Sequence, residues 1–472
     1  MVFSSLTFIC IFLPAVFVLY YILRGDGVRN VLLVVASLVF YAFGEPVYII
    51  LMLASITVNY FLGVLLDRTG RRKAVLALAV ILNLGALAVF KYAGWFVSTI
   101  ASLAGVDIPV PELALPIGIS FYTFQALSYL IDVYRRQVKH QKNPVYFCLY
   151  ISFFPQLIAG PIVKYHDIEK QIAKRTYDPD AVAAGFRRFI RGLAKKVIIA
   201  NTMALAVDTI FAYDPAQINA ASAWTAAIAY ALQIFFDFSG YSDMAIGMGR
   251  MFGFRFLENF NYPYTAGSMK EFWRKWHISL STWFREYLYI PLGGNRKGKL
   301  RTCLNKLIAF FCTGLWHGAN WTFVLWGMIH GGFLLMEDAV PVKKMPAALR
   351  HVYTMLVVVV TFVIFRADTI TDAGNMISKM FTGFNGSGIS GILAAEVFSP
   401  FFIFILVIAV ILCMPVYPKL FAKTDIGLAA GCGTAVSSRL TVAANILSVL
   451  LLVYCILMLS GGGYNPFIYF RF

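Results

Sequence analysis

The sequence predicts an all-α polytopic membrane protein with roughly 11–12 membrane-embedded helices, some of them broken or re-entrant. Of its 472 residues, 60% are hydrophobic and only 13% are charged. A soluble domain carries roughly 25% charged residues, so this chain has too little polar surface to face water on all sides. Apolar runs of about 20 residues, the length that crosses a bilayer as a helix, recur along the whole chain.

These runs give twelve candidate spans. They are residues 3–23, 30–48, 49–66, 74–95, 114–133, 145–163, 196–212, 222–248, 304–336, 350–366, 399–417 and 440–460. No segment has the composition of a separate soluble domain. We therefore expect residues 1–472 to form a single integral membrane domain.

The basic residues lie mainly in the loops between the spans. The net charge is +17, with 40 Lys and Arg against 23 Asp and Glu. Cytoplasmic loops and anionic lipid headgroups favour such cations, so we expect membrane lipids, and not nucleic acid, as their partners. The basic loops after the first, third and fifth spans predict a cytoplasmic side there and an external start of the first span. Their cations are Arg24, Arg29, Arg68, Arg71, Arg72, Lys73, Arg135, Arg136, Lys139 and Lys142.

The sixth segment conflicts with this alternation, because basic residues follow it as well. It contains FFPQLIAGP, in which Pro155, Gly160 and Pro161 disfavour a straight helix. A broken or re-entrant element that returns to the cytoplasmic side explains both facts.

The stretch GFRRFIRGLAKKV at residues 185–197 is amphipathic. One helical face carries only apolar side chains and basic residues cover the rest, as in a helix that lies at a membrane interface. The apolar side chains are Phe186, Phe189, Ile190, Leu193 and Val197.

Two further segments lie outside the spans. Residues 250–306 carry eleven Lys or Arg against three Glu, which predicts a cytoplasmic basic region. Residues 368–396 are rich in glycine, and we expect an external loop there. The seven cysteines have no paired spacing, so neither a metal site nor a disulfide is predicted.

One histidine lies deep inside an apolar run. Residues 307–336 contain no Lys, Arg, Asp or Glu, yet His317 stands in FFCTGLWHGANWTF. Counted from residue 307, His317 is about 15 Å into a core about 30 Å thick. Gly314, Gly318 and Asn320 favour a break beside it. An ionisable side chain at that depth indicates a functional site, although a neutral histidine that hydrogen-bonds to a neighbouring helix is an alternative. For His330 the structural interpretation is favoured.

A second group of chemistry-bearing residues lies in the basic region, in MKEFWRKWHISLSTWFREYLYIPLGG. Helical spacing places Trp273, His277 and Ser281 on one face, and Lys270 and Arg274 on one face. An interfacial belt of aromatic and basic side chains is the alternative explanation.

Two carboxylates, Asp237 and Asp243, lie in the apolar span 222–248. Buried carboxylates can line an ion or proton path, which keeps a transporter function open. Alternatively they pair with cations of residues 270–306. The chain has no phosphate-binding loop, dinucleotide-binding glycine pattern, CxxC pair or HExxH motif.

The chain resembles the membrane-bound O-acyltransferase family, and within it the branch of the alginate O-acetyltransferase membrane subunit. The resemblance is specific over residues 1–338, and the rest of the chain matches only in its hydrophobic character. The motifs that carry it are LPIGISFYTFQALSYLIDVYR, FFPQLIAGPIVKY, IFFDFSGYSDMAIG, EFWRKWHISLSTWFREYLYIPLGG and GLWHGANWTFVLWGMIHG.

The resemblance implies a core of residues 1–338, arranged around a central funnel or tunnel, with C-terminal membrane helices in residues 339–472. It places the two hallmark histidines of the family at His277 and His317, of which His317 is the one assigned as catalytic. Acetyl-CoA is the expected acyl donor, with no permanently bound cofactor. We expect Arg274, Lys275, Trp273 and Trp276 to bind the donor, and Trp316, Asn320, Trp321, Asp237 and Asp243 to line the substrate tunnel.

The function that the resemblance implies is transfer of acetyl from cytoplasmic acetyl-CoA toward hydroxyls of an extracytoplasmic polysaccharide. An exported or membrane-anchored acyltransferase is the expected partner, and the cytoplasmic (inner) membrane the expected location. Two alternatives stay open. One is D-alanyl transfer from a carrier-protein thioester to teichoic acid, and the other is a transporter that uses Asp237 and Asp243.

Overall fold

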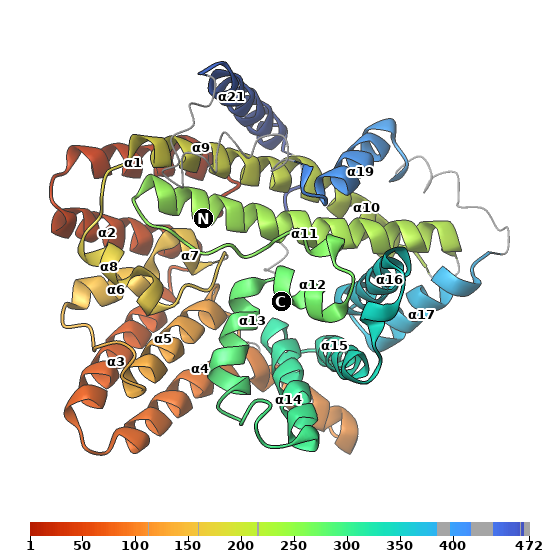
Figure 1. Ribbon diagram of the computed structural model, residues 1–472, viewed down its shortest axis with the longest axis horizontal. Coiled ribbons are helices and arrows are strands. Elements are labelled where there is room, and N and C mark those ends of the chain that lie inside the picture. Colours follow the sequence, from red (N-terminus) through yellow and green to blue (C-terminus); the bar gives the residue numbers. More distant parts are fainter. Residues whose placement is uncertain are drawn as a thin grey trace. The chain divides into compact units, whose positions relative to one another are not determined.

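The computed structural model is helical, with no strand in the part of the chain that it describes (Figure 1). It describes residues 1–111, 113–158, 160–214, 217–384, 397–416, 438–462 and 464–466. Backbone contacts divide the chain into two compact units. The first comprises Met1–Phe186 and Ala245–Leu257, and the second comprises Arg187–Met244 and Glu258–Phe472. That the whole chain acts as one membrane domain stays a prediction.

The first unit contains the helices of the N-terminal part of the chain. They are the π-helical turn η1 (Phe8–Phe12), α1 (Leu13–Ile22), α2 (Asp26–Gly44), α3 (Ile49–Arg68), α4 (Arg72–Ala104), α5 (Ile119–Tyr134), α6 (Pro144–Ser152), α7 (Phe154–Leu157) and α8 (Tyr165–Ala173). Two longer helices, α9 (Pro179–Ala194) and α11 (Ala220–Met251), have residues in both units.

The second unit holds the remaining helices. They are the π-helical turn η2 (Lys195–Ala200), α10 (Asn201–Ala212), η4 (Pro263–Thr265), α12 (Met269–Lys275), α13 (Ile278–Phe284), the π-helical turn η5 (Arg285–Tyr289), α14 (Lys299–His317), α15 (Trp321–Ala339), η6 (Val342–Lys344), α16 (Ala347–Arg366), α17 (Ile370–Thr382), α19 (Pro400–Leu412) and α21 (Ser438–Ser460).

Within the described residues, five helices are long and apolar enough to cross a membrane: α2, α3, α4, α16 and residues Val442–Ser460 of α21. Shorter apolar helices cover Phe8–Ile22 and Pro400–Leu412. Each of the twelve candidate spans falls on at least one helix, so the all-α membrane class is confirmed.

The break predicted in the sixth segment is present. α6 ends at Ser152, and a separate short helix, α7, begins at Phe154. Gly160 follows with φ = +132°, a conformation that only glycine adopts without strain. Pro155 lies in the first turn of α7, where the missing N–H costs no helical hydrogen bond.

The amphipathic stretch forms the last part of α9 and continues through η2 into α10. Four of its five apolar side chains are buried: Phe189, Ile190, Leu193 and Val197. The predicted apolar face is therefore present.

The charge-free run forms two helices that pack as a hairpin, with the turn at Gly318–Asn320. Figure 1 shows α14 and α15 adjacent. Glycines allow this close packing. A Cβ on Gly327 would lie 2.4 Å from the Phe310 carbonyl oxygen, and a Cβ on Gly314 would lie 2.4 Å from that of Phe323. The predicted break beside His317 is confirmed, and each arm is about 28 Å long.

The segment predicted as an external loop contains a helix. Residues 368–396 are not irregular throughout, because α17 occupies Ile370–Thr382. Thr369 caps this helix by accepting a hydrogen bond from the Asp372 N–H at 3.1 Å. The glycines that suggested a loop are concentrated after Thr382. Residues 385–396 lie outside the described part of the chain.

Candidate functional site

The motif that contains His277 does not form one helix. α12 ends at Lys275 and α13 begins at Ile278. His277 lies between them with φ = +44° and ψ = +55°, a left-handed conformation that a residue with a Cβ rarely adopts. The prediction that Trp273, His277 and Ser281 share one helical face is therefore wrong, because the break turns α13 away from the axis of α12.

His277 is 1% exposed and packs among aromatic rings. Its ring centroid lies 4.5 Å from that of Phe238, and its Nδ1 lies 3.1 Å from the Asn259 side-chain oxygen. His277 is outside all the predicted spans. Burial lowers the pKa of His277 well below its ordinary value, and a charge on His317 lowers it further. The imidazole is therefore neutral near pH 7.

His317 is the last residue of α14 and is 8% exposed. Its ring packs edge-on against Trp316, Trp326 and Phe365, with centroid distances of 5.0, 5.2 and 5.0 Å. Trp316 also contacts the His277 ring at 5.8 Å. The structure therefore brings the two histidines, forty residues apart in sequence, into contact with the same tryptophan ring.

His330 has a different environment. Its Nδ1 accepts a hydrogen bond from the Trp273 indole N–H at 3.1 Å, so its Nε2 carries the proton and donates to Thr361 Oγ1 at 3.0 Å. Both ring nitrogens are used, and the side chain is fully buried. This arrangement agrees with the structural role favoured for His330.

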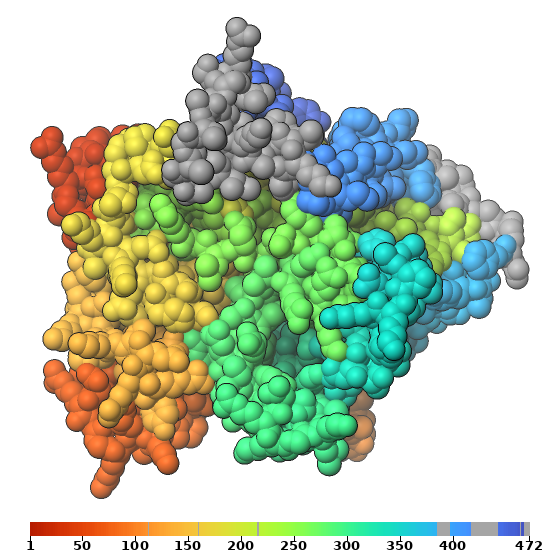
Figure 2. Space-filling view, viewed as in Figure 1, coloured from red at the N-terminus to blue at the C-terminus, as the bar shows by residue number. Residues whose placement is uncertain are grey.

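A cavity of about 400 Å³ lies beside α12 within the second unit. Figure 2 shows the surface hollowed among the green and teal atoms of α12–α15. Apolar side chains form much of its wall: Trp273, Leu280, Phe284, Ala309, Phe310 and Leu334. The hydroxyls of Ser281, Tyr289 and Thr313 add polar points. The cavity can thus accept a mainly apolar chain that has a few polar groups.

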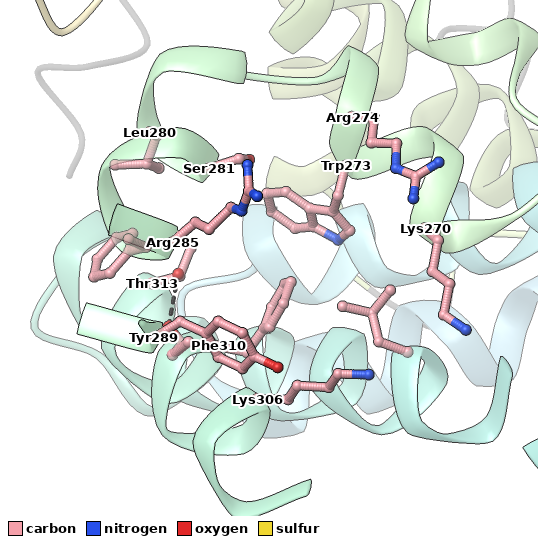
Figure 3. Close-up of a pocket in the computed structure, with 13 residues that line it drawn as sticks. Lys270, Trp273, Arg274, Leu280, Ser281, Arg285, Tyr289, Lys306, Phe310 and Thr313 are labelled. Atoms are coloured by element: carbon pink, nitrogen blue, oxygen red, sulfur yellow. Dashed lines mark hydrogen bonds between the residues drawn. The ribbon is translucent and has the colours of Figure 1, made fainter. Parts of the chain in front are cut away.

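Four cations also line this cavity, as Figure 3 shows. They are Lys270 and Arg274 of α12, Arg285 of η5 and Lys306 of α14. These four basic side chains are suited to bind the phosphate groups of a ligand.

Asp338, just beyond the charge-free run, joins two of these cations. It accepts from Lys270 at 2.6 Å and also from Lys306. Burial raises the pKa of Asp338, but the hydrogen bonds and charges of the two lysines outweigh burial and hold that pKa below its ordinary value. Asp338 is therefore ionised at neutral pH.

The neighbouring Glu337 fixes the start of α12. Its side-chain oxygens accept hydrogen bonds from the backbone N–H groups of Met269 at 2.5 Å and Lys270 at 3.1 Å. These N–H groups have no partner inside the helix. The end of α15 therefore sets the position of the helix that carries Lys270, Trp273 and Arg274.

The residues predicted to bind the donor are divided between two places. Trp273 and Arg274 line the cavity. Lys275 points elsewhere, pairing with Glu271 at 2.8 Å and donating to Thr265 Oγ1 at 3.0 Å. Trp276 is buried in an aromatic stack, 5.4 Å from the Phe272 ring.

The residues near the α14–α15 turn that were predicted to line the substrate tunnel also lie in different environments. Trp316 is buried and contacts both histidine rings, whereas Trp321 is 48% exposed. Asn320 caps α15 by accepting from the Thr322 N–H at 3.1 Å, and its amide N–H donates to the Asp368 carbonyl at 2.8 Å. Because both ends of this amide are engaged in the turn, we assign Asn320 no part in the chemistry.

Asp237 and Asp243 both pair with cations of residues 188–196. Asp237 lies 3.1 Å from Lys196, and both side chains are 1% exposed. Asp243 lies 2.8 Å from Arg188 and 2.7 Å from Lys195. The partners come from α9 and η2, which the sequence pattern placed at a membrane interface.

Sequence reasoning did not identify Asn259, Lys270, Arg285 or Lys306 as site residues. Lys306 borders the charge-free run and Lys270 shares the face of Arg274, so both signals were present in the sequence. Nothing in ENFNYPY marks Asn259. Among the described residues, no three His, Cys, Asp or Glu side chains are grouped as metal ligands.

Comparison with known proteins matches the amino-acid sequence to a family model. Residues 87–367 match the model of the membrane-bound O-acyltransferase family. The "Probable alginate O-acetylase AlgI" of Azotobacter vinelandii is 40% identical over 504 aligned positions, which cover 100% of both chains. The alignment thus extends beyond residue 338, where the specific resemblance was expected to end.

Two relatives carry other names. The "Peptidoglycan O-acetyltransferase" of Helicobacter pylori is 36% identical over 82% of this chain and 80% of its own. The "Teichoic acid D-alanyltransferase" of Bacillus subtilis is 30% identical over 47% of this chain and 58% of its own. The family match includes His277, His317 and all the residues that line the cavity. The chain therefore belongs to the membrane-bound O-acyltransferase family.

Proposed function

We propose that this membrane O-acyltransferase moves acetyl from cytoplasmic acetyl-CoA toward hydroxyls of an extracytoplasmic polysaccharide, alginate or another exopolysaccharide. The observation that carries the proposal is the basic, largely apolar cavity, which lies in the same unit as two buried histidines. Relatives that align with at least four fifths of the chain are named for O-acetylation of alginate and peptidoglycan, which supports acetyl as the group.

The cavity suits the chemistry of coenzyme A. Its phosphates need cations, which Lys270, Arg274, Arg285 and Lys306 supply, and its pantetheine arm is partly apolar. Trp273 connects this cavity to the histidines, because its ring lies 5.7 Å from Trp326, which lies 5.2 Å from His317. We propose that a thioester anchored at the cations extends past Trp273 toward His317.

In the proposed reaction His317 acts as general base. A neutral imidazole removes the proton of the acceptor hydroxyl while the hydroxyl oxygen attacks the thioester carbonyl. Collapse of the tetrahedral adduct breaks the carbon–sulfur bond, and the proton held by His317 passes to the departing thiolate. The surrounding rings of Trp316, Trp326 and Phe365 exclude water, which protects the thioester from hydrolysis.

We propose the cytoplasmic (inner) membrane as the location, and an exported or membrane-anchored acyltransferase as the partner that completes delivery to the polysaccharide. No cofactor needs to stay bound between turnovers. Asp237 and Asp243 take a structural role in this proposal, because each is ion-paired with cations of its own unit.

The first test is the His317→Ala variant in the cells that make the polysaccharide. Without a general base we expect acetylation to fall about 100-fold or more. The measurement is the O-acetyl content of the isolated polysaccharide by proton NMR, at equal amounts of protein in the membrane. His351→Ala is the matched control, because His351 is not among the residues that line the cavity and its Nδ1 lies 3.3 Å from the Ala266 carbonyl oxygen. Wild-type acetylation in His317→Ala would contradict the assignment.

D-alanyl transfer is the second candidate, supported by the shorter match to the Bacillus subtilis relative. The acyl donor that the purified protein uses distinguishes these two functions. Purified protein that releases free thiol from acetyl-CoA supports acetyl transfer. Thiol release only from a D-alanyl carrier-protein thioester supports the alternative.

A further inference from the structure

We propose that Asn259 is a positioning residue that holds His277 with its proton on Nδ1, so that Nε2 presents its lone pair to the reaction. The inference rests on the proposed acyl transfer for its kinetic consequences. Its structural basis is independent of the donor and of the acceptor.

The orientation of the Asn259 amide follows from its neighbours. A backbone N–H can only donate, and that of Ser279 lies 3.2 Å from one side-chain atom of Asn259, which must therefore be the oxygen. The Ser279 hydroxyl donates to the same oxygen at 2.8 Å. The opposite atom, the amide nitrogen, donates to Ser242 Oγ at 3.2 Å.

The protonation of His277 follows in turn. Its Nδ1 lies 3.1 Å from this oxygen, which accepts and cannot donate, so Nδ1 carries the hydrogen. A neutral imidazole has one ring hydrogen, so Nε2 has a lone pair. Nε2 is buried and has no hydrogen-bond partner among the residues that the structure describes. A buried acceptor without a partner is costly, and we assign Nε2 to a hydrogen-bonding group of the substrate.

The backbone at His277 supports the same conclusion. A left-handed conformation at a histidine costs about 1 kcal/mol or more and persists only where its surroundings enforce it. Asn259 does so twice, since its backbone carbonyl accepts the Ile278 N–H at 2.9 Å and its side chain accepts the Ser279 N–H. One residue thus fixes both the turn and the tautomer.

Among the described residues packed around His277, one titratable group, His317, acts on its charge. Phe238 packs from α11, Phe260 from the segment before η4, and Trp316 and His317 from α14. Of these only His317 can change its charge. His277 is therefore suited to accept a hydrogen bond or a proton at Nε2, next to the residue that we propose as general base.

Two substitutions of His277 test the roles of its two ring nitrogens separately. His277→Asn keeps a donor at the place of Nδ1 and lacks any atom at Nε2, whereas His277→Gln places an amide group near Nε2. We expect His277→Asn to fold, by its thermal unfolding in detergent, but to lose about 100-fold in kcat. His277→Gln should retain more activity than His277→Asn. If His277→Asn keeps wild-type kcat, only the Nδ1 contact matters and the proposal is wrong.

Two substitutions of Asn259 test the positioning itself. Asn259→Asp keeps an oxygen for Nδ1–H but adds a negative charge, which raises the pKa of His277. Because the reaction needs the neutral ring, the acidic limb of the kcat profile should move about one unit to higher pH. Asn259→Leu offers no acceptor and should lower kcat without changing KM for acetyl-CoA. Equal activity and an unchanged pH profile in both variants would overturn the proposal.

A spectroscopic measurement distinguishes failure of this proposal from failure of the proposed function. In purified protein with ¹⁵N-labelled histidine, the signal absent from His277→Asn belongs to His277. We expect its Nδ1 to be protonated and its Nε2 not, whether or not acetyl-CoA is a substrate. A protonated Nε2 in the wild type would refute the inference, even in a protein that transfers acetyl.

Discussion

At the scale of single residues, hydrogen bonding distinguishes histidines that composition alone cannot. His277 and His330 are both buried in the second unit among tryptophans and phenylalanines. His330 uses both ring nitrogens, toward Trp273 and Thr361, and so stabilises the packing. His277 uses Nδ1 alone among the described residues, which leaves Nε2 for a substrate.

Asp338 gives a prediction at this scale. Its carboxylate holds Lys270 and Lys306, two cations that we assign to the donor phosphates. In Asp338→Asn the two lysines lose this competing anion, so we expect KM for acetyl-CoA to fall about 2–5-fold with little change in kcat. The expected change in KM is small because these side chains are 22–41% exposed and solvent screens their charges.

The effect of Asp338→Asn should also depend on pH in a definite direction. The pKa of Asp338 is lowered, so the wild-type carboxylate stays charged down to pH values below the ordinary range. The KM difference between wild type and variant should therefore persist from pH 6 to pH 8. Asp180→Asn, which removes the same charge outside the cavity, is the control. A rise of KM in Asp338→Asn alone would show that Asp338 orders the lysines for binding and does not compete with the donor.

The sequence was sufficient to predict part of the site at residue level. His317 was identified by its place in a run without charge, and Trp273 and Arg274 by the aromatic and basic motif. Asn259 was not, because it acts through one oxygen that receives donors from His277 and Ser279, eighteen and twenty residues away. Lys275 and Trp276 were placed in the donor site by their neighbours in sequence, but the helix turns them away from the cavity.

At the scale of helices, breaks that contain glycine or proline were predictable and one without them was not. The turn at Gly318–Asn320 and the break at Phe153 both have such residues nearby. The break at His277 lies in EFWRKWHISLSTWF, which contains neither residue. The backbone of His277 is set by Asn259, a tertiary contact that helical periodicity does not include.

The α14–α15 hairpin gives a prediction at this scale. Gly327 faces α14, and a Cβ there would lie 2.4 Å from the Phe310 carbonyl oxygen and 3.2 Å from the Gly314 Cα. We expect Gly327→Ala to force the two helices apart and to destabilise the protein by about 1–3 kcal/mol. Because the hairpin carries His317, acetyl transfer should fall as well. Thermal unfolding in detergent and the transfer rate are the measurements.

The matched control is Gly332→Ala on the same helix. A Cβ at Gly332 has nothing within 4 Å, and alanine favours a helix over glycine by about 1 kcal/mol. This variant should unfold at the wild-type temperature or slightly above it. Equal unfolding temperatures for Gly327→Ala and Gly332→Ala would show that close packing of the hairpin is not needed.

At the scale of the whole molecule, the order of helices was predictable and their contacts were not. For the C-terminal residues the sequence predicted only apolar helices. In the structure, the Phe365 ring of α16 packs against the His317 ring. The next residue, Arg366, binds Asp208 of α10, and Asp208 also accepts from Tyr464. Asn465 in turn accepts from Asn201 at 3.1 Å. Such contacts join segments up to 264 residues apart, a separation over which a hydrophobic pattern carries no information about pairing.

The most direct measurement of the central claim uses sealed inverted membrane vesicles from the polysaccharide-producing cells. Acetyl-CoA with a radiolabelled acetyl group is added outside, where the cytoplasmic face is exposed, and label on luminal polysaccharide is counted. The account predicts labelling with the wild type and with His351→Ala, and about 100-fold less with His317→Ala. Equal labelling with His317→Ala, or none with the wild type, would contradict it.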